Sequence, residues 1–548
     1  MSDRFALHFV PEGYSVAGSK LMGRQAAGAG LMRAIARADN LASVGCFAAN
    51  AAHAAECERA LKEQGYRGAL EWVDSGRPEQ LDSFGCLYHP APGISRLAWR
   101  RLRAGERAYS LCGITHTTAS HAIMSGMTEL LAAPVKSWDA VICTSAVVRD
   151  SVRQLLEQQA DYLRARLGAQ RFELPQLPLI PLGVHCADFR FDEAHRMQAR
   201  AGLQIAADDV AFLFLGRLSF HAKAHPQQMF AALERADKQG RRVHLILCGW
   251  FANDAIEKAF TEAAALLCPS VRLVVLDGRV PQNQAQAWAA ADVFTSLSDN
   301  IQETFGLTPA EAMAAGLPCV VSDRNGYRET VRDGIDGFRI PTVMPQAGSG
   351  ADLAQRYDDG IDSYDIYCGY SSQAVALDSE SLTQAYGRLI GDASLRKTMG
   401  ENARRRAEQA FDWQVIFRRY QDLWSELNER RRADPDLWPA LPNTVPDRPD
   451  PFRLFRSYPT RTLNDETQLS LAAASARELV AQYRRLGINR FAIASLPTPE
   501  EFDRILDGIG ASQVAAGDIA GMFDAGRRAQ IMRGLAWLCK MDILRIVA

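Results

Sequence analysis

The chain of 548 residues is too long for a single hydrophobic core, and we expect about three domains. Hydrophobic residues make up 47% of the chain and charged residues 23%, which is ordinary for a globular protein. The formal net charge of −2 gives no sign of a nucleic-acid-binding surface, and no apolar run approaches the roughly 20 residues needed to cross a bilayer.

The first 190 residues alternate strand-like apolar runs with helix-like segments, which is typical of a parallel sheet with helices on both faces. A first strand is predicted at Phe5–Val10. A glycine-rich connection over Gly18–Gly30 then leads to a helix over Leu31–Ala38. Five more strand-like runs continue the series: Ala42–Phe47, Gly85–His89, Ser110–Thr115, Ala140–Ser145 and Leu177–Val184.

A second series of alternating strands and helices is predicted over residues 191–410. Its first strand ends at Gly216-Arg217, and Lys223 follows on the same strand-to-helix loop. Such a pair suits a diphosphate, because arginine binds as a bidentate fork and lysine as a point charge. Two solvated loop cations would give the same short pattern. The expected strands are Val210–Leu215, Val243–Gly249, Val274–Val280, Ala291–Ser298 and Cys319–Ser322, with a helix from His225 to about Gly240.

Two carboxylates, Glu303 and Glu311, flank a Phe-Gly-Leu turn between the last two of these strands. Thr308-Pro-Ala-Glu311 has the form of a capping box with Thr308 as the N-cap. Strand ends and a helix N-terminus together favour an anionic ligand. Two simpler interpretations stay open, in which Glu311 only completes the capping box and Glu303 is a solvated loop carboxylate. The backbone N–H groups expected to face a diphosphate are those of Phe305, Gly306 and Leu307.

The stretch from Glu303 to Glu311 resembles the Glu-x7-Glu motif of retaining glycosyltransferases with the GT-B fold, in particular glycosyltransferase family 4 (group 1). The resemblance implies that Glu311 binds the ribose of a donor nucleotide. Glu303 would lie against the donor sugar, and the backbone that follows it, Thr304 included, would bind the diphosphate. The spacing of Arg217 and Lys223 is similar to the Gly-Arg-Leu-x4-Lys pair with which the family neutralises the leaving diphosphate.

The resemblance, which extends to about residue 430, implies an α/β protein with two Rossmann-like domains facing across a cleft. Residues 1–190 would be the acceptor-side domain and 191–410 the nucleotide-sugar-binding domain, with a helix over 411–428 returning to the first. The implied reaction is metal-independent, retaining transfer from a nucleotide-diphosphate sugar to a glycan, lipid-linked or protein acceptor, in polysaccharide, lipopolysaccharide or glycoconjugate synthesis. A sugar-nucleotide epimerase, a phosphorylase and a non-catalytic partner subunit stay open as alternatives.

Two further donor-side features follow from the resemblance. Arg279 and Val280 lie on the loop that packs on the nucleotide base in this family, although an ordinary surface loop fits equally well. Trp288 nearby is expected to be a core residue. His116 follows a predicted strand at the place where family members often have a histidine close to the donor sugar. It could exchange a proton there, and a hydrogen-bonded structural histidine fits equally well.

The N-terminal loop from Gly18 to Gln25 resembles a glycine-containing loop that nears the donor phosphates. Gly23 would allow close backbone approach, and Arg24 and Gln25 would contact the acceptor or the phosphates. The loop is not a dinucleotide fingerprint, because a third glycine in phase is missing and no strand precedes it directly. His89 and His121 are weaker acceptor-side candidates.

The remaining segments have structural interpretations. Ile180–His185 resembles the family's interdomain signature Pro-x-Gly-Val-Asp, with a histidine in place of the aspartate, and is predicted to be the hinge. Residues 346–373 depart from the family pattern and are expected to form a solvated loop rather than a binding lid. Residues 430–460 are predicted to be a linker and 461–548 a helical accessory module. An aromatic packing stripe is expected on the returning helix at Phe411, Trp413, Phe417, Tyr420 and Trp424.

The eleven cysteines occur singly, without zinc-site spacing, and several lie inside strand patterns as small core residues. Because Met1–Phe5 also lacks a signal-peptide pattern, a reducing, cytoplasmic setting is predicted. We expect no metal, no cofactor beyond the nucleotide sugar, and no nucleic-acid partner. Peripheral contact with the inner membrane face and homo-oligomer formation through the C-terminal module stay open.

Overall fold

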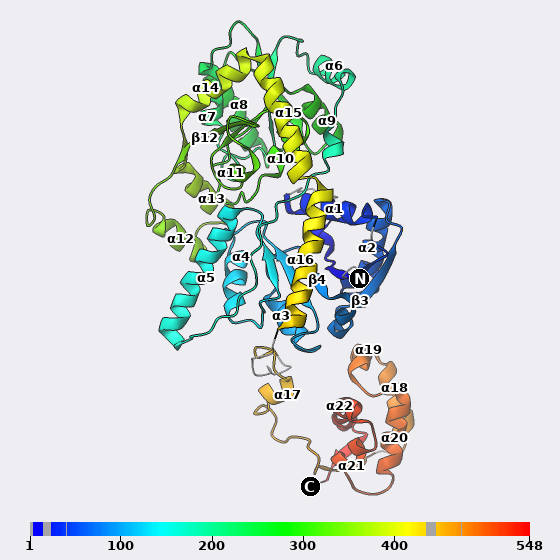
Figure 1. Ribbon diagram of the computed structural model, residues 1–548. Coiled ribbons are helices and arrows are strands. Elements are labelled where there is room, and N and C mark those ends of the chain that lie inside the picture. Colours follow the sequence, from blue (N-terminus) through cyan, green and yellow to red (C-terminus); the bar gives the residue numbers. More distant parts are fainter. Residues whose placement is uncertain (1–3, 15–22, 40, 435–444, 473, 548) are drawn as a thin grey trace. The chain divides into compact units, whose positions relative to one another are not determined.

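The computed structural model describes residues 4–14, 23–39, 41–434, 445–472 and 474–547. The chain divides into two compact units, Met1–Val445 and Pro446–Ala548 (Figure 1). The first unit contains two six-stranded parallel sheets, and the second contains a three-stranded antiparallel sheet. Residues 18–22 of the predicted phosphate-side loop lie outside the described residues.

The first sheet has the strand order β3-β2-β1-β4-β5-β6. The order reverses between β1 and β4, and ligands of open α/β sheets bind at the carboxyl ends of the strands at such a switch point. Its strands are β1 (Phe5–His8), β2 (Ser43–Ala48), β3 (Ala69–Asp74), β4 (Cys86–Tyr88), β5 (Ser110–Ile114) and β6 (Ala140–Ile142). Its helices are α1 (Gly23–Ala36), α2 (Ala51–Glu63), α3 (Ser95–Arg101), α4 (His121–Thr128) and α5 (Ala146–Leu167).

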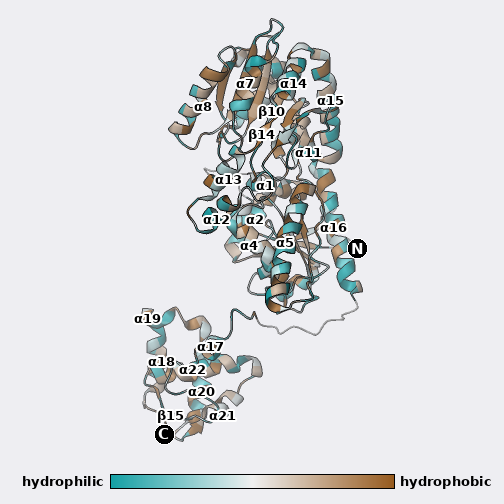
Figure 2. Ribbon diagram, turned by 90° about the vertical axis from the view of Figure 1, so that its left-hand side faces the viewer, coloured by the Kyte–Doolittle hydropathy of each residue, from teal (hydrophilic) through white to brown (hydrophobic). Residues whose placement is uncertain are grey.

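The second sheet repeats this plan in the order β12-β11-β10-β7-β8-β9, with its switch point between β7 and β10. Figure 2 shows apolar strands enclosed by helices with hydrophilic outer faces. The strands are β7 (Val210–Leu215), β8 (Val243–Gly249), β9 (Arg272–Asp277), β10 (Val293–Ser296), β11 (Cys319–Ser322) and β12 (Gly337–Ile340). The helices are α6 (Glu193–Gly202), α7 (Gln227–Arg235), α8 (Asp254–Leu267), α9 (Pro281–Ala290), α10 (Leu307–Ala314), α11 (Tyr327–Thr330), α14 (Ser379–Gly391) and α15 (Ala393–Ala410). This is the GT-B fold, as expected.

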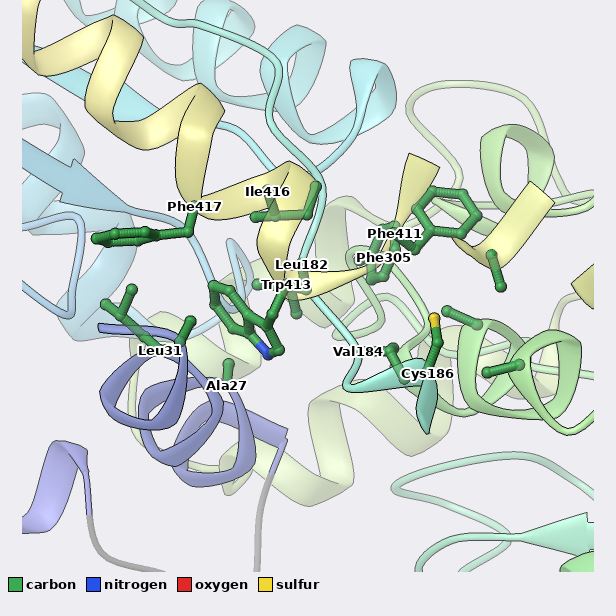
Figure 3. Packing of buried hydrophobic residues seen from close by; sticks show 14 of the residues in the cluster. Ala27, Leu31, Leu182, Val184, Cys186, Phe305, Phe411, Trp413, Ile416 and Phe417 are labelled. Atoms are coloured by element: carbon green, nitrogen blue, oxygen red, sulfur yellow. The ribbon is translucent and has the colours of Figure 1, made fainter. Parts of the chain in front are cut away.

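The chain passes between the two domains twice, and the two connecting segments hydrogen-bond to each other at the hinge. The N–H of Val184 donates to the carbonyl of Phe411 (2.7 Å), and the N–H of Trp413 donates to the carbonyl of Val184 (3.0 Å). Helix α16 (Trp413–Ala433) then returns to the first sheet and buries its aromatic stripe there. Trp413 packs beside Ala27 and Leu31 of α1 (Figure 3). The helix predicted over 411–428 thus begins at Trp413, and Phe411 precedes it and packs on Phe305 instead.

Three sequence-based expectations for the first domain were wrong. Helix α1 begins at Gly23 rather than Leu31, because Gly28 and Gly30 allow it to pack closely. A Cβ on Gly28 would lie 2.0 Å from the carbonyl oxygen of Gly13. Strand β3 was missed because most of its residues are not buried, so it lacks a strong apolar run. The expected strand Leu177–Val184 makes only isolated bridges, since its two prolines cannot donate ladder hydrogen bonds.

Of the run Tyr357–Tyr367, for which a solvated loop was predicted, only residues 359–363 are non-helical, because two helices lie within residues 346–373. These are α12 (Ala351–Asp358) and α13 (Tyr364–Gln373). A short antiparallel pair, β13 (Thr342–Val343) with β14 (Ala376–Leu377), closes the base of this hairpin. The acidic, tyrosine-rich sequence did not predict these helices. In the structure their Tyr357 and Cys368 side chains are buried.

The second unit has its own apolar core, which includes Leu469, Phe502 and Leu535. Its sheet, in the order β16-β15-β17, was not predicted. The strands are β15 (Gln468–Leu471), β16 (Val514–Ala515) and β17 (Leu544–Ile546). The helices are α17 (Pro451–Leu454), α18 (Ala476–Arg485), α19 (Gly487–Arg490), α20 (Pro499–Ile509), α21 (Ala516–Gly521) and α22 (Arg528–Lys540).

Candidate active site

Charged side chains from two loops meet at the switch point of the second sheet. Arg217 and Lys223 lie on the loop after β7, and Glu303 lies on the loop after β10. Lys223 Nζ forms an ion pair with the Glu303 carboxylate. Arg217 donates to the carbonyl of Ala222 (2.8 Å) and to Gln302 Oε1 (3.4 Å). The structure therefore brings together three of the predicted donor-site residues.

In this ion pair, burial and the charge of the partner shift the pKa of each group in opposite directions. Burial disfavours both charges, but the Glu303 carboxylate overcomes this for Lys223 and holds the pKa of its ammonium group above the ordinary value. Burial likewise opposes the charge on Glu303, and Lys223 together with the N–H groups of Phe305 and Thr304 holds the pKa of this carboxyl below its usual range. Both groups are therefore charged at neutral pH.

The loop from Glu303 to Leu307 turns sharply at Gly306, whose φ is +92°. A Cβ at this position would also lie 2.1 Å from Cε1 of Tyr327, so only glycine fits. Helix α10 starts at Leu307 with Gly306 as its N-cap, and no side chain caps it. The predicted capping box at Thr308 was therefore wrong, because the helix begins two residues earlier than that box requires.

Glu311 lies in the first turns of α10 with its side chain partly buried. Burial raises the pKa of its carboxyl to about 7, and the nearby charge of Lys223 only partly offsets this. Within the described part of the chain, no hydrogen bond stabilises the ionised form of Glu311. The simpler interpretation, in which Glu311 completes a capping box, does not hold. A partly buried carboxyl group that no hydrogen bond from the described residues stabilises suits a ligand that brings hydroxyl donors.

The first domain approaches this loop through Thr304. Its hydroxyl donates to the carbonyl of His116 (3.1 Å), and its own carbonyl accepts from Ser145 Oγ (2.6 Å). In addition, Glu329 accepts from the N–H of Ala146 (2.6 Å) at the N-terminus of α5. Thr304 thus joins the predicted donor loop to the residue predicted for proton exchange. Ser145 and Glu329 carried no motif that sequence reasoning could have used.

His116 follows β5, and its ring is held by a hydrogen bond to the backbone of Pro90. Burial and the charge of Arg24 lower the pKa of His116 to about 4. Its imidazole is therefore neutral at neutral pH. One ring nitrogen of His116 is hydrogen-bonded to Pro90, so only the other ring nitrogen can bind a ligand.

Two other histidines lie at the switch point of the first sheet. His8 ends β1 and His89 follows β4, and their Nδ1 atoms are 2.9 Å apart. The two rings stack at 4.8 Å. Burial lowers the pKa of His8 to about 4 and that of His89 to about 3. Sequence reasoning gave His89 only as a weaker candidate and did not single out His8, because their adjacency depends on the pairing of β1 with β4.

The helical hairpin α12–α13 touches loops of both domains. Tyr357 stacks on His121 of α4 at 3.7 Å, and its hydroxyl accepts from the His121 N–H (3.1 Å). The hydroxyl of Tyr364 is 3.1 Å from Thr117 Oγ1, one residue beyond His116. On the other side, a Cβ on Gly369 would lie 2.8 Å from Cβ of His221, on the loop that carries Lys223. The hairpin thus borders both predicted halves of the site.

The remaining predicted residues are divided between the surface and the core. Arg279 is exposed and pairs with Asp277 (2.8 Å), and Val280 is the N-cap of α9. A Cβ on Gly23 would meet nothing within 4 Å, so the packing around Gly23 does not require a glycine. Arg24 is exposed and Gln25 partly buried in the first turn of α1. Phe305 and Leu307 contribute apolar side chains to the core, which leaves only their backbone for a ligand. Trp288 is a core residue, as expected.

Comparisons with known proteins agree with this arrangement. Residues 196–351, which include the five charged residues predicted for the donor site, match the family model "Glycosyl transferases group 1". The solved structure of Anabaena HepE in complex with UDP and glucose superposes with a TM-score of 0.50 and 17% identity, over 77% of this chain and 100% of that one. The superposition shows the GT-B fold, and the family match is confined to residues 196–351.

Several curated relatives are D-inositol 3-phosphate glycosyltransferases. The protein of Nocardia farcinica is 30% identical over 186 residues, or 33% of this chain and 40% of that protein. The protein of Mycobacteroides abscessus is 27% identical over 345 residues, or 59% of this chain and 74% of that protein. The chain thus spans less than half of the Nocardia relative.

Proposed function

We propose that this protein transfers a sugar from a nucleoside-diphosphate sugar to an acceptor hydroxyl, with retention of anomeric configuration and without a metal ion. The observation that carries the proposal is the meeting of Arg217, Lys223 and Glu303 at the switch point of the second sheet, with the unpartnered Glu311 beside them. The cations Arg217 and Lys223 next to the Glu311 carboxylate suit a ligand that is anionic at one end and rich in hydroxyls at the other.

In this proposal the donor lies along the loop after β10. Arg217, Lys223 and the backbone N–H groups of Thr304 to Leu307 hold the diphosphate, aided by the N-terminus of α10. Glu311 accepts hydrogen bonds from the ribose hydroxyls, and Glu303 faces the donor sugar. Arg279 and Val280 border the base through their backbone. In the structure Glu303 is paired with Lys223, so donor binding would share this lysine between the carboxylate and the diphosphate.

The reaction breaks the bond between the anomeric carbon and the diphosphate oxygen and forms a bond from that carbon to the acceptor oxygen on the same face. The acceptor proton passes to the departing diphosphate, whose charge is neutralised by Arg217 and Lys223. Stabilising this charge is the largest catalytic task. His116, neutral at physiological pH, positions the acceptor or the transferred sugar. Arg24 and Gln25 would contact the acceptor.

Binding and turnover assays test this proposal. A thermal-shift screen of UDP-, GDP- and ADP-sugars identifies the donor, because a bound ligand stabilises the native state. UDP-glucose and D-inositol 3-phosphate are the first donor and acceptor to try, because the HepE structure holds UDP and glucose and D-inositol 3-phosphate is part of the curated relatives' name. Lys223→Ala and Glu311→Ala should each abolish most donor-dependent turnover.

Lys238→Ala is the matched control. Lys238 has the same side-chain exposure as Lys223 (21%) and is also paired with a glutamate, but it follows the C-terminal end of α7, whereas the loop after β7 precedes that helix. It should leave turnover unchanged. If Lys223→Ala and Glu311→Ala both kept full turnover, the proposal would be wrong. Epimerised product formed without an acceptor would favour an epimerase, and calorimetry showing no binding of any nucleotide sugar would favour a non-catalytic subunit.

A further inference from the structure

Exposed apolar side chains in the second unit concentrate in two segments. Within the described part of that unit, ten large apolar side chains are exposed, and eight of them lie within residues 452–458 or 486–493. Phe491 is 86% exposed, Tyr458 79% and Ile488 78%. Single exposed apolar residues are ordinary, but grouped ones mark an interaction surface. The eight are Phe452, Leu454, Phe455, Tyr458, Leu486, Ile488, Phe491 and Ile493.

Arginines lie within and next to these two segments. Residues 452–461 contain three arginines and residues 484–493 contain three, and neither stretch contains an aspartate or glutamate. Five of these six arginines are exposed. In the described part of the unit, none of these five forms an ion pair, whereas Arg477, Arg527 and Arg528 do. The five are Arg453, Arg456, Arg461, Arg485 and Arg490.

The local structure keeps these side chains at the surface. Helix α18 buries Ala476 and Val480 and ends at Arg485. The short helix α19 that follows, Gly487–Arg490, buries none of its residues. Helix α17 likewise buries none of its residues. These turns therefore do not stabilise the unit's own core, and their apolar side chains are available to a partner.

We propose that the second unit binds the surface of an anionic lipid bilayer through residues 452–461 and 484–493. Aromatic and aliphatic side chains next to unpaired arginines are the combination that inserts into the interface between headgroups and acyl chains. Unpaired arginines complement the phosphate of anionic lipids. No helix among the described residues is long and apolar enough to cross the bilayer, so the contact lies at the surface. The inference is independent of the proposed sugar transfer.

The test is sedimentation of the full chain with vesicles of phosphatidylcholine, with and without about 30 mol% phosphatidylglycerol. The chain should sediment with the anionic vesicles and not with pure phosphatidylcholine. Arg485→Gln/Arg490→Gln should weaken binding roughly 25-fold, since each arginine near an anionic surface contributes about fivefold. Ile488→Ser/Phe491→Ser should weaken it at least about tenfold, because the inserted apolar area is lost.

The matched control is Leu266→Ser, because Leu266 of α8 is 79% exposed but lies in the first unit. It should bind vesicles like the unaltered chain. Because all substituted side chains are exposed, the variants should keep the melting temperature, which confirms that they fold. Raising the salt concentration from about 0.1 M to about 1 M should release the chain, since the Debye length falls from about 10 Å to about 3 Å.

Three results would overturn the inference. One is equal sedimentation with neutral and anionic vesicles, and another is undiminished binding of the Ile488→Ser/Phe491→Ser variant. The third is a dimer in solution that this variant dissociates, with no vesicle binding by the unaltered chain. That outcome would assign the surface to a second copy of the protein.

Discussion

Replacing Glu311 by glutamine should stabilise the protein while impairing donor binding. Burial raises the pKa of Glu311 from 4.5 to about 7, so the folded state holds this proton more tightly than the unfolded state does. Stability from this group is then fully present below about pH 4.5 and is lost as the pH rises through 7. Each pH unit in this interval corresponds to about 1.36 kcal/mol, or about 3 kcal/mol in all. Because the side chain is only partly buried by its neighbours, we expect about 1 to 3 kcal/mol.

Equilibrium urea unfolding at pH 5 and pH 8 measures this effect. Glu311→Gln should match the unaltered protein at pH 5 and exceed it by the stated amount at pH 8, because glutamine keeps the shape without the charge. Glu262→Gln, at an exposed surface pair, should change stability by less than about 0.5 kcal/mol at either pH. A Glu311→Gln protein that is less stable than the unaltered one at pH 8, or a difference that does not vary with pH, would refute the reasoning.

The same variant links stability to function. If the ionised carboxylate accepts hydrogen bonds from the ribose, donor affinity of the unaltered protein should fall as the pH drops below about 7, where Glu311 takes up a proton. Glu311→Gln should bind the donor weakly at every pH. Calorimetric titration with the nucleotide at pH 5.5 and pH 8 distinguishes these outcomes. Equal affinity at both pH values in the unaltered protein would contradict a ribose-binding role.

Three other substitutions test the architecture of the first unit. Gly306→Ala should lower the free energy of unfolding by more than about 1 kcal/mol and impair nucleotide binding, because the positive φ strains alanine; an unchanged melting temperature would contradict this. Tyr357→Ala should speed amide exchange across residues 351–373, whereas Tyr370→Ala, at an exposed position on the same hairpin, should not. Asp139→Asn should cost about 3 to 5 kcal/mol in unfolding experiments, because it leaves the fully buried Arg101 without its countercharge. A cost below about 1 kcal/mol would show that water reaches this pair.

Local patterns predicted much of the second domain. Strand β11 runs over Cys319–Ser322, as expected, because the run is buried and bounded by a proline and polar residues. The loops after β7 and β10 were also located correctly, since buried strands of a parallel sheet become polar where they end. The error at Thr308 was local as well. Gly306 can adopt the left-handed conformation that starts the helix early, and a sequence match to a capping box does not reveal this.

The sequence alone determined the strand–helix alternation that builds two parallel sheets, and it located the loops that carry Arg217, Lys223 and Glu303. These depend on periodicity and on short motifs, which act over a few neighbouring residues. The tertiary structure alone decided that Lys223 pairs with Glu303, that His8 meets His89, and that the 346–373 hairpin contacts both domains. Such pairings join residues tens to hundreds of positions apart. They depend on strand order and on burial. These decide which side chains meet and how their pKa values shift, and a local sequence pattern contains neither.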